Sequence, residues 1–212
     1  MLGNLRPALP SGTKRMGART GSARTPEQTD IARFWQLTGA ATYNPVTRQA
    51  AKAKNLDLLD TARLFALSSI ATADTAIAIF DAKYAHNFWR PVTAIRNGDI
   101  DGNDATTLDA SWEPMIATPM HPEYPCAHCT FQGAAAGVLQ VMYGDTLPRF
   151  TLTSSTAPGM TRSYERLSDF VDEVINARIY EGVHYRTSGL VGAALGRKVA
   201  EEVVKNELQP LQ

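Results

Sequence analysis

The chain lacks a net charge, because 21 lysine and arginine residues balance 21 aspartate and glutamate residues among its 212 positions. Without a global electrostatic field, its composition gives no attraction for nucleic acid or for an anionic membrane. Cysteine is scarce as well, and two residues, Cys126 and Cys129, are too few for a framework of disulfides. Any anion must therefore be bound by a local group of cations.

Long apolar runs are also missing. The most hydrophobic stretch, residues 62–80, is interrupted at several polar positions, which are Ser68, Ser69, Thr72, Asp74 and Thr75. A membrane-spanning helix needs about 20 predominantly apolar residues. We therefore expect no membrane span and a soluble protein, whose compartment the sequence leaves unassigned.

The first 24 residues contain no acidic residue and no apolar segment of the kind that a secretory signal requires. Their basic residues are Arg6, Lys14, Arg15, Arg19 and Arg24. We expect residues 1–24 to be a disordered or leader-like basic arm, or the cut edge of a longer protein. A chain of this length buries one substantial core, so residues 25–212 are expected to form a single helical domain.

Helical periodicity dominates the rest of the chain. Thr25 and Gln28 predict a capped helix start, with Pro26 at the first helical position, and this helix should run to about Leu37. Residues 39–46 then predict a turn-rich connection with a boundary at Pro45. Apolar residues at three- and four-residue steps between residues 56 and 88 predict one long helix or two abutting ones.

The second half continues in the same way. Residues 97–124 are rich in glycine, proline, asparagine and aspartate and predict an irregular segment. A small-residue helix should follow Pro125 as far as about Tyr143, another should start near Thr161 or Ser163 and reach Ile179, and a last one should span residues 183–205. No strand-like alternation and no internal repeat is convincing. The expected fold is an all-α helical bundle.

Three segments carry the residues that could bind an anion. Lys83 and Arg90 are seven residues apart, so on a helix they would fall on nearly the same face, and Pro91 follows directly. The second segment is Pro125-Cys126-Ala127-His128, and the third runs from Arg178 to His184. A tetrahedral oxyanion needs donors from several directions, which cations, forked arginine heads and the N–H groups of a helix start supply.

In this order the three segments closely resemble the vanadium-dependent haloperoxidase and type 2 phosphatidic acid phosphatase superfamily, over about residues 24–204. The resemblance implies a helical bundle around a cage for vanadate, with phosphate as a competing ligand. The cage residues that it implies are Lys83, Arg90, Cys126, Ala127, Arg178 and His184.

The resemblance also implies roles. His184 would bond the central atom, as the ligand of vanadium or as the nucleophile toward phosphorus, and His128 would be the acid–base partner. In the peroxidase reaction Lys83 would polarise bound hydrogen peroxide, and a halide would be oxidised to hypohalous acid that reacts with a small organic acceptor. His121, seven residues before His128, lies in a context similar to algal bromoperoxidases, which favours bromide or iodide.

Two other functions remain open. The same cage could serve an acid phosphatase, with His184 as nucleophile and His128 as general acid, or the chain could be an inactive helical scaffold. The family usually has serine and glycine where this chain has Cys126 and Ala127, and the phosphatase branch has aspartate where this chain has Ser188. Another acid could take the place of that aspartate in three dimensions.

Cys126 and Cys129 also fit other patterns. Their spacing is that of a redox dithiol or of half a zinc site, but further zinc ligands are not evident, and the βαβ pattern of a dithiol protein is missing. A cysteine beside peroxide would be open to oxidation. Finally, the family often forms intertwined dimers, so a homodimer is a further expectation.

Overall fold

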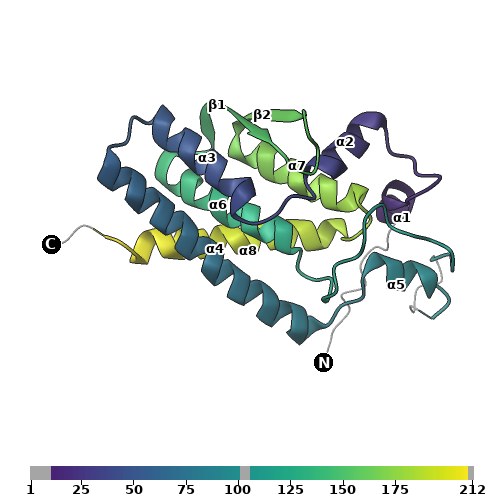
Figure 1. The fold of residues 1–212 in the computed structure, drawn as a ribbon. Helices are drawn as coiled ribbons and strands as arrows, with labels where there is room; N and C mark the ends of the chain where they lie inside the picture. The colour runs from purple at the N-terminus through teal and green to yellow at the C-terminus, as the bar shows by residue number, and fades with distance from the viewer. Residues whose placement is uncertain (1–10, 101–105, 210–212) are drawn as a thin grey trace.

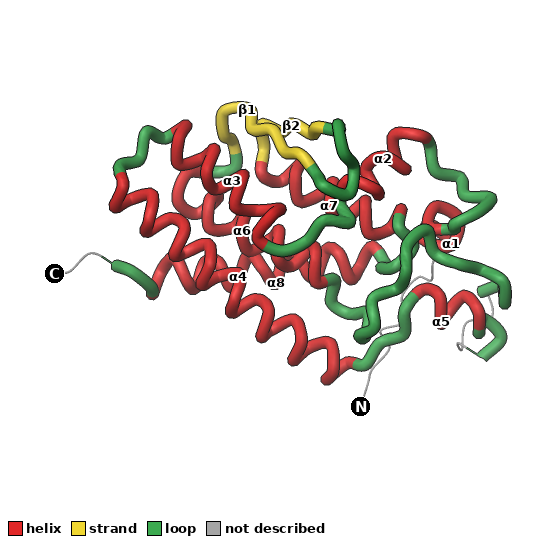
Figure 2. Tube along the Cα trace, viewed as in Figure 1, coloured by secondary structure: helices red, strands yellow, loops and turns green. Residues whose placement is uncertain are grey.

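The structure is a computed structural model that describes residues 11–100 and 106–209, and it is mainly helical (Figures 1 and 2). The all-α bundle predicted from the sequence is confirmed. The elements in chain order are α1 (Ser11–Gly17), α2 (Pro26–Phe34), α3 (Ala40–Ala53), α4 (Leu58–His86), α5 (Pro91–Arg96), α6 (Ala127–Tyr143), β1 (Thr146–Thr153), β2 (Thr161–Arg166), α7 (Leu167–Tyr180) and α8 (Arg186–Asn206).

Helices α6 and α8 pack tightly against each other at the centre, with α4 and α7 beside them (Figure 1). Small residues permit this close approach. A Cβ atom on Gly196 would lie 2.1 Å from the backbone oxygen of Thr130, and one on Gly133 would lie 2.4 Å from the oxygen of Ala193. The backbones therefore meet where side chains would normally separate them. This contact fixes the start of α6, which carries His128, against the start of α8, which follows His184.

Several sequence predictions for helices are confirmed. Thr25 caps α2 in a capping box with Gln28 and with Pro26 at the start of the helix. Residues 58–86 form one continuous helix rather than two. Its N-cap is Asp57, whose side chain accepts from the backbone N–H of Asp60, and its C-cap is Asn87 in the left-handed conformation. That left-handed residue ends the helix and turns the chain toward Arg90.

The predicted turn over residues 39–46 is wrong, because α3 begins at Ala40 and contains Pro45. Proline at this position removes one backbone hydrogen bond. Packing outweighs that loss, since the helix buries Val46, Ala50 and Ala51 in the core. The proline rule correctly identified a position where the helix is weakened, but it does not take into account the apolar face that α3 buries after the proline.

The β1–β2 hairpin was missed, and the helix predicted from Thr161 or Ser163 instead begins at Leu167. The strands pair antiparallel, with Phe150 opposite Tyr164, and an irregularity lies between Thr146 and Phe150. That irregularity breaks the two-residue alternation by which a strand is recognised. The hairpin lies over α7 and next to α3, and its aromatic side chains pack against Phe170.

Residues 11–24 are folded, which contradicts the expected disordered arm for this part, whereas residues 1–10 lie outside the described residues. Helix α1 is seated on the turn between α7 and α8 by two glycines. Gly182 has φ 80°, and a Cβ on Gly17 would lie 2.3 Å from its Cα. The hydroxyl of Thr13 donates to the backbone oxygen of His184 at 3.2 Å. The segment therefore helps to position a predicted site residue.

Helix α4 and α5 together, residues 58–96, form one stretch that is long and apolar enough to cross a membrane, and 39% of its most apolar window is buried. A single stretch of this kind is weak support for a span, since the core helix of a water-soluble bundle has the same composition. The absence of a membrane span therefore stays a prediction.

The outer face of α4 exposes three large apolar side chains one helical turn apart: Ile77, Phe80 and Tyr84. Contiguous exposed apolar surface of this kind is typical of interaction sites. If the expected homodimer pairs through this face, light scattering will give the mass of two chains for the wild type and of one chain for Ile77→Asp. A wild-type mass of one chain at micromolar concentration would contradict the expectation.

Candidate active site

The three predicted cations lie buried near one another, although they come from different elements. Lys83 is in the last turn of α4, Arg90 is the N-cap of α5, and Arg178 is in the last turn of α7. Their exposed fractions are 0%, 6% and 2%. Burial of a cation is costly unless acceptors or an anion compensate for the lost water. Three such residues in one region therefore indicate a site for negative charge.

Lys83 and Arg90 hold the irregular segment that precedes α6. The Lys83 ammonium donates to the backbone oxygens of Pro122 at 2.8 Å and Glu123 at 3.0 Å. Arg90 donates through Nε to the oxygen of His121 at 3.0 Å and through Nη1 to that of Val183 at 2.8 Å. Arg90 thus joins the segment before α6 to the turn before α8.

His184 is held from both sides of its ring. Its Nδ1 is 2.7 Å from Oε1 of Glu123, and its Nε2 is 3.1 Å from Nη1 of Arg90. Because the guanidinium can only donate, Nε2 is the acceptor and the ring proton lies on Nδ1, shared with the carboxylate. Burial, followed by the charges of Arg90 and Arg178, lowers the pKa of His184 well below its usual value. The ring is therefore neutral and its Nε2 lone pair is directed at Arg90.

Glu123 is a site residue that the sequence reasoning missed. Its Oε1 also accepts from the backbone N–H of Tyr185 at 3.0 Å, and the residue is fully buried. Burial raises its pKa to about 7. Partners of this type fix the tautomer and orientation of a ligating or nucleophilic histidine. The phosphatase pattern places an aspartate where this chain has Ser188. Glu123 supplies a carboxylate to His184 from a different position in the sequence.

Arg178 has a carboxylate partner that the sequence also left unnoticed. Its Nη1 lies within ion-pair distance of the Glu181 carboxyl group, one turn later, and both side chains are buried. Burial raises the pKa of Glu181 to about 8, although the charge of Arg178 opposes this rise. Glu181 therefore carries little negative charge below pH 8 and gains it above, which makes the net charge around Arg178 dependent on pH.

Glu181→Gln is expected to change how anion affinity depends on pH. Above pH 8 the wild-type carboxylate becomes ionised and competes with a bound oxyanion for Arg178, whereas the amide does not. We expect the variant to bind phosphate roughly tenfold more tightly than the wild type at pH 9 and about equally at pH 6, since one nearby like charge is removed. Calorimetric titration of both proteins measures the ratio of their phosphate affinities at each pH. Phosphate itself also changes its protonation over this range, but that change affects both proteins equally and cancels from the ratio. An unchanged ratio between the two pH values would contradict the role of Glu181.

The start of α6 supplies His128, Cys126 and Ala127. Burial and then Arg178 lower the pKa of His128 well below its usual value, so this imidazole is neutral. Among the described residues, its buried Nε2 has no hydrogen-bond partner. Cys126 is the N-cap, and its backbone N–H donates to the oxygen of Ser188 at 3.2 Å. The expected anion donor at Cys126 is therefore already committed, because the first turn of α8 packs against it.

His121 lies at the edge of this group. Its Nδ1 is 3.1 Å from Nη2 of Arg90, and its ring packs edge-on against Phe80 at 5.4 Å between centroids. Burial and then Lys83 lower its pKa. The His121 side chain is partly exposed, whereas Arg90 is buried.

The pKa shifts of the cations and histidines in this group have common causes. Burial and then the charge of Arg90 lower the pKa of Lys83 to about 8, and burial lowers that of Arg90 to about 10. Arg178 acts on both of these cations and on both histidines. The five side chains named from the sequence, which are Lys83, Arg90, His128, Arg178 and His184, thus share one electrostatic environment.

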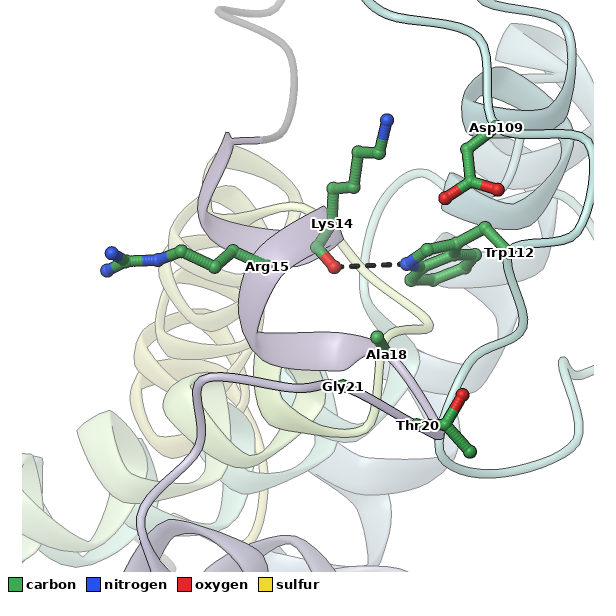
Figure 3. A pocket seen from close by; sticks show the side chains of 7 residues that line it. All are labelled: Lys14, Arg15, Ala18, Thr20, Gly21, Asp109 and Trp112. Atoms are coloured by element: carbon green, nitrogen blue, oxygen red, sulfur yellow. Dashed lines mark hydrogen bonds between the residues drawn. The ribbon is translucent and has the colours of Figure 1, made fainter.

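A separate depression lies between α1 and the segment after α5, and none of the predicted site residues lines it (Figure 3). Within it the Trp112 indole N–H donates to the backbone oxygen of Lys14 at 3.0 Å. This contact fastens α1 to the segment that continues to His121 and Glu123. Its lining consists of Lys14, Arg15, Ala18, Thr20, Gly21, Asp109 and Trp112.

Comparison with known proteins decides the family. The family model of the VCPO second helical-bundle domain matches residues 63–212, which include every site residue described above. The chain belongs to this vanadium haloperoxidase family. A vanadium chloroperoxidase from Curvularia inaequalis is 31% identical over 148 residues, with 59% of this chain and 24% of that protein covered.

Solved haloperoxidase structures share the fold. A bacterial vanadium-dependent iodoperoxidase is 34% identical in sequence and superposes with a TM-score of 0.72. The match includes 84% of this chain and 43% of the iodoperoxidase chain. A bacterial vanadium-dependent chloroperoxidase in its apo form has a TM-score of 0.70 at 18% identity, over 92% of this chain and 47% of its own. The chain thus spans less than half the length of these haloperoxidases.

The residues present fit the vanadate that these haloperoxidase relatives imply. Within residues 11–100 and 106–209, no cluster of three or more His, Cys, Asp and Glu side chains could hold a metal ion directly. An oxyanion needs no such cluster, because cations hold its oxygens and one imidazole bonds its centre. Two of three Lys83 donors serve backbone carbonyls, which leaves one N–H for an anion. The buried Nε2 of His128, which has no hydrogen-bond partner among the described residues, is a further polar atom that a bound group could satisfy.

Proposed function

We propose that the chain carries a vanadate-dependent haloperoxidase site that oxidises iodide or bromide with hydrogen peroxide to hypohalous acid. The observation that carries the proposal is the neutral His184 ring, fixed by Glu123 on one side and with its Nε2 lone pair directed at Arg90, one of three buried cations, on the other. Such an arrangement suits a group that combines a Lewis-acidic centre with negatively charged oxygens. The iodoperoxidase among the similar structures and the position of His121 support the choice of halide.

The residues would divide the work as follows. His184 would hold vanadium through Nε2, while Lys83, Arg90 and Arg178 would hold the oxygens, together with the N–H of Ala127 in the first turn of α6. Bound vanadate would act as a Lewis acid that activates hydrogen peroxide toward halide. His128, neutral and with an unpartnered Nε2, would take the proton of the peroxide as it binds. A small organic acceptor would then react with the hypohalous acid.

A phosphatase is the second candidate, and Glu123 favours it. A nucleophilic histidine needs a carboxylate on its far nitrogen, and Glu123 supplies one at 2.7 Å despite serine at position 188. His128 would then protonate the leaving alcohol. In this reaction phosphate and vanadate would compete for the same cations.

One pair of assays separates the candidates. Protein loaded with vanadate is given peroxide and bromide or iodide with a halogen-accepting dye, and protein without vanadate is given p-nitrophenyl phosphate. The proposal expects halogenation that requires vanadate. Hydrolysis without halogenation would assign the chain to phosphatases. No response in either assay, with no rise in melting temperature on adding either anion, would establish the inactive scaffold.

Glu123→Gln tests the positioning of His184. The amide keeps the size of the side chain but loses the charge that fixes the Nδ1 proton, so we expect a 10- to 100-fold loss in vanadate affinity or halide oxidation. The matched control is Glu113→Gln, because Glu113 lies in the same irregular segment but is about half exposed and pairs with Arg19. Equal activity of the two variants, measured as kcat and KM for peroxide, would remove Glu123 from the site.

A further inference from the structure

We infer that Cys126 and Cys129 form a redox-active dithiol, which hydrogen peroxide oxidises to an intramolecular disulfide at the start of α6. This would be a second, thiol-based peroxide-consuming site that needs no vanadate. It goes beyond the proposed function and does not depend on it. No βαβ pattern surrounds the two cysteines, but the local geometry, rather than the surrounding fold, decides whether the bond can form.

The two residues occupy the positions of a helix start that suit a disulfide. Cys126 is the N-cap and Cys129 is the third helical residue, and the backbone N–H of Cys129 donates to Sγ of Cys126 at 3.4 Å. The side chain of Cys126 thus already turns back toward Cys129. Residues three apart in a helical turn have Cα atoms within the range that a disulfide spans. Both cysteines are free thiols, so both are available for the bond.

The surroundings assign different parts to the two sulfurs. Burial alone would disfavour a Cys126 thiolate, but hydrogen bonding to Cys129 and the charge of Arg178 together lower its pKa. Burial, and then the hydrogen bond to Cys126, raises the pKa of Cys129 well above the usual value. Cys126, at the positive end of the helix dipole, is therefore the nucleophile, and Cys129 keeps its proton as the resolving thiol.

Burial selects a small oxidant. Neither cysteine has exposed surface, so a bulky disulfide reagent could reach them only if the helices opened. Hydrogen peroxide is close to water in size. Both sulfurs belong to the hydrophobic core, but the charge of Arg178 acts on each of them. Peroxide is also the oxidant that a haloperoxidase receives as substrate.

The chemistry balances with peroxide as the only oxidant. The Cys126 thiolate attacks one oxygen, an S–O bond forms while the O–O bond breaks, and the departing hydroxide takes up a proton to become water. The Cys129 sulfur then attacks the sulfenic sulfur of Cys126, the S–S bond forms, and the S–O bond breaks. The Cys129 proton leaves with that oxygen as a second water. Two thiols are oxidised by two electrons and one peroxide is reduced, and a small dithiol such as dithiothreitol restores the thiols.

The test uses the full chain free of vanadate. After treatment with one equivalent of hydrogen peroxide, the protein is quenched, denatured, alkylated and weighed by mass spectrometry. We expect the loss of two hydrogen atoms, no alkylation, and a peptide in which Cys126 and Cys129 are joined. Two cysteines that remain free thiols and are both alkylated would overturn the inference. Oxidation beyond sulfenic acid without a disulfide would also overturn it. This measurement needs no variant and so does not depend on the folding of one.

Two variants assign the roles. Cys129→Ser is expected to trap sulfenic acid on Cys126, detected as a dimedone adduct, whereas Cys126→Ser is expected to give no adduct and to lose dithiothreitol-dependent peroxide consumption. An adduct on Cys129 in Cys126→Ser would contradict the assignment of the nucleophile. Because halide oxidation is assayed only after vanadate loading, failure of the dithiol and failure of the haloperoxidase proposal give different results.

Discussion

His184→Ala is expected to abolish vanadate binding and, with it, halide oxidation. The substitution removes an imidazole nitrogen that contacts the buried Arg90, and no other histidine ring among the described residues is held between a carboxylate and an arginine. Loss of a first ligand to a metal centre exceeds the 10- to 100-fold effect of its supporting partners. We therefore expect a loss of more than a hundredfold in affinity, measured by calorimetric titration of vanadate.

The matched control for this variant is His86→Ala. His86 is exposed and packs edge-on against Tyr124, with 5.0 Å between ring centroids, so its removal leaves the cations and Glu123 untouched. The control should bind vanadate as the wild type does. If His184→Ala also binds vanadate with undiminished affinity while remaining folded by circular dichroism, the assignment of His184 as the ligand is wrong.

Arg90→Ala is expected to cause the second large loss of activity. Arg90 touches the oxygens of His121 and Val183 and the ring of His184, so it both supplies charge and connects the two segments that carry the histidines. We expect a loss of about 100- to 1,000-fold in kcat for halide oxidation, the usual consequence of removing one preorganised donor. The buried carbonyl of Val183 and the partly buried carbonyl of His121 also lose their donor, which should cost about 1–3 kcal/mol of unfolding free energy for the buried one and less for the other.

Arg90→Lys distinguishes charge from shape. Lysine keeps the cation but cannot reach several acceptors at once with a planar fork, so its activity should fall between those of the wild type and the alanine variant. The control is Arg48→Ala on the exposed surface of α3, which should leave both activity and melting temperature unchanged. Full activity in Arg90→Lys would mean that only the charge of Arg90 matters and that its role in joining the two segments is dispensable.

The sequence predicted the parts of this molecule that repeat a local rule. The cap of α2, the continuous α4 and the small-residue helix α6 follow from spacing and composition along a few turns. The motif residues also come together as expected, since each is placed by the end or the start of a helix. The hairpin was not predicted because its alternation is interrupted between Thr146 and Phe150. Helix α3 was not predicted because its buried face lies beyond Pro45.

The missed site residues depend on contacts between distant segments. Glu123 and His184 are 61 positions apart, and their contact exists only because α6 and α8 pack closely and bring the preceding segments together. The position four residues after His184 gave no signal, as it holds Ser188. Glu181 lies within the motif itself, but its pairing with Arg178 follows from complete burial, which spacing alone does not reveal. The order in residues 11–24 likewise comes from the contact of Gly17 with Gly182 rather than from local composition.

The central claim is that Lys83, Arg90, Arg178, His128 and His184 bind one tetrahedral oxyanion between them. Vanadium NMR during titration of vanadate into the wild-type chain tests it most directly, with inorganic phosphate added at the end as competitor. We predict one saturable bound signal per chain that phosphate displaces and that His184→Ala lacks. A spectrum of free vanadate at every protein concentration, or a bound signal that persists in His184→Ala, would contradict it.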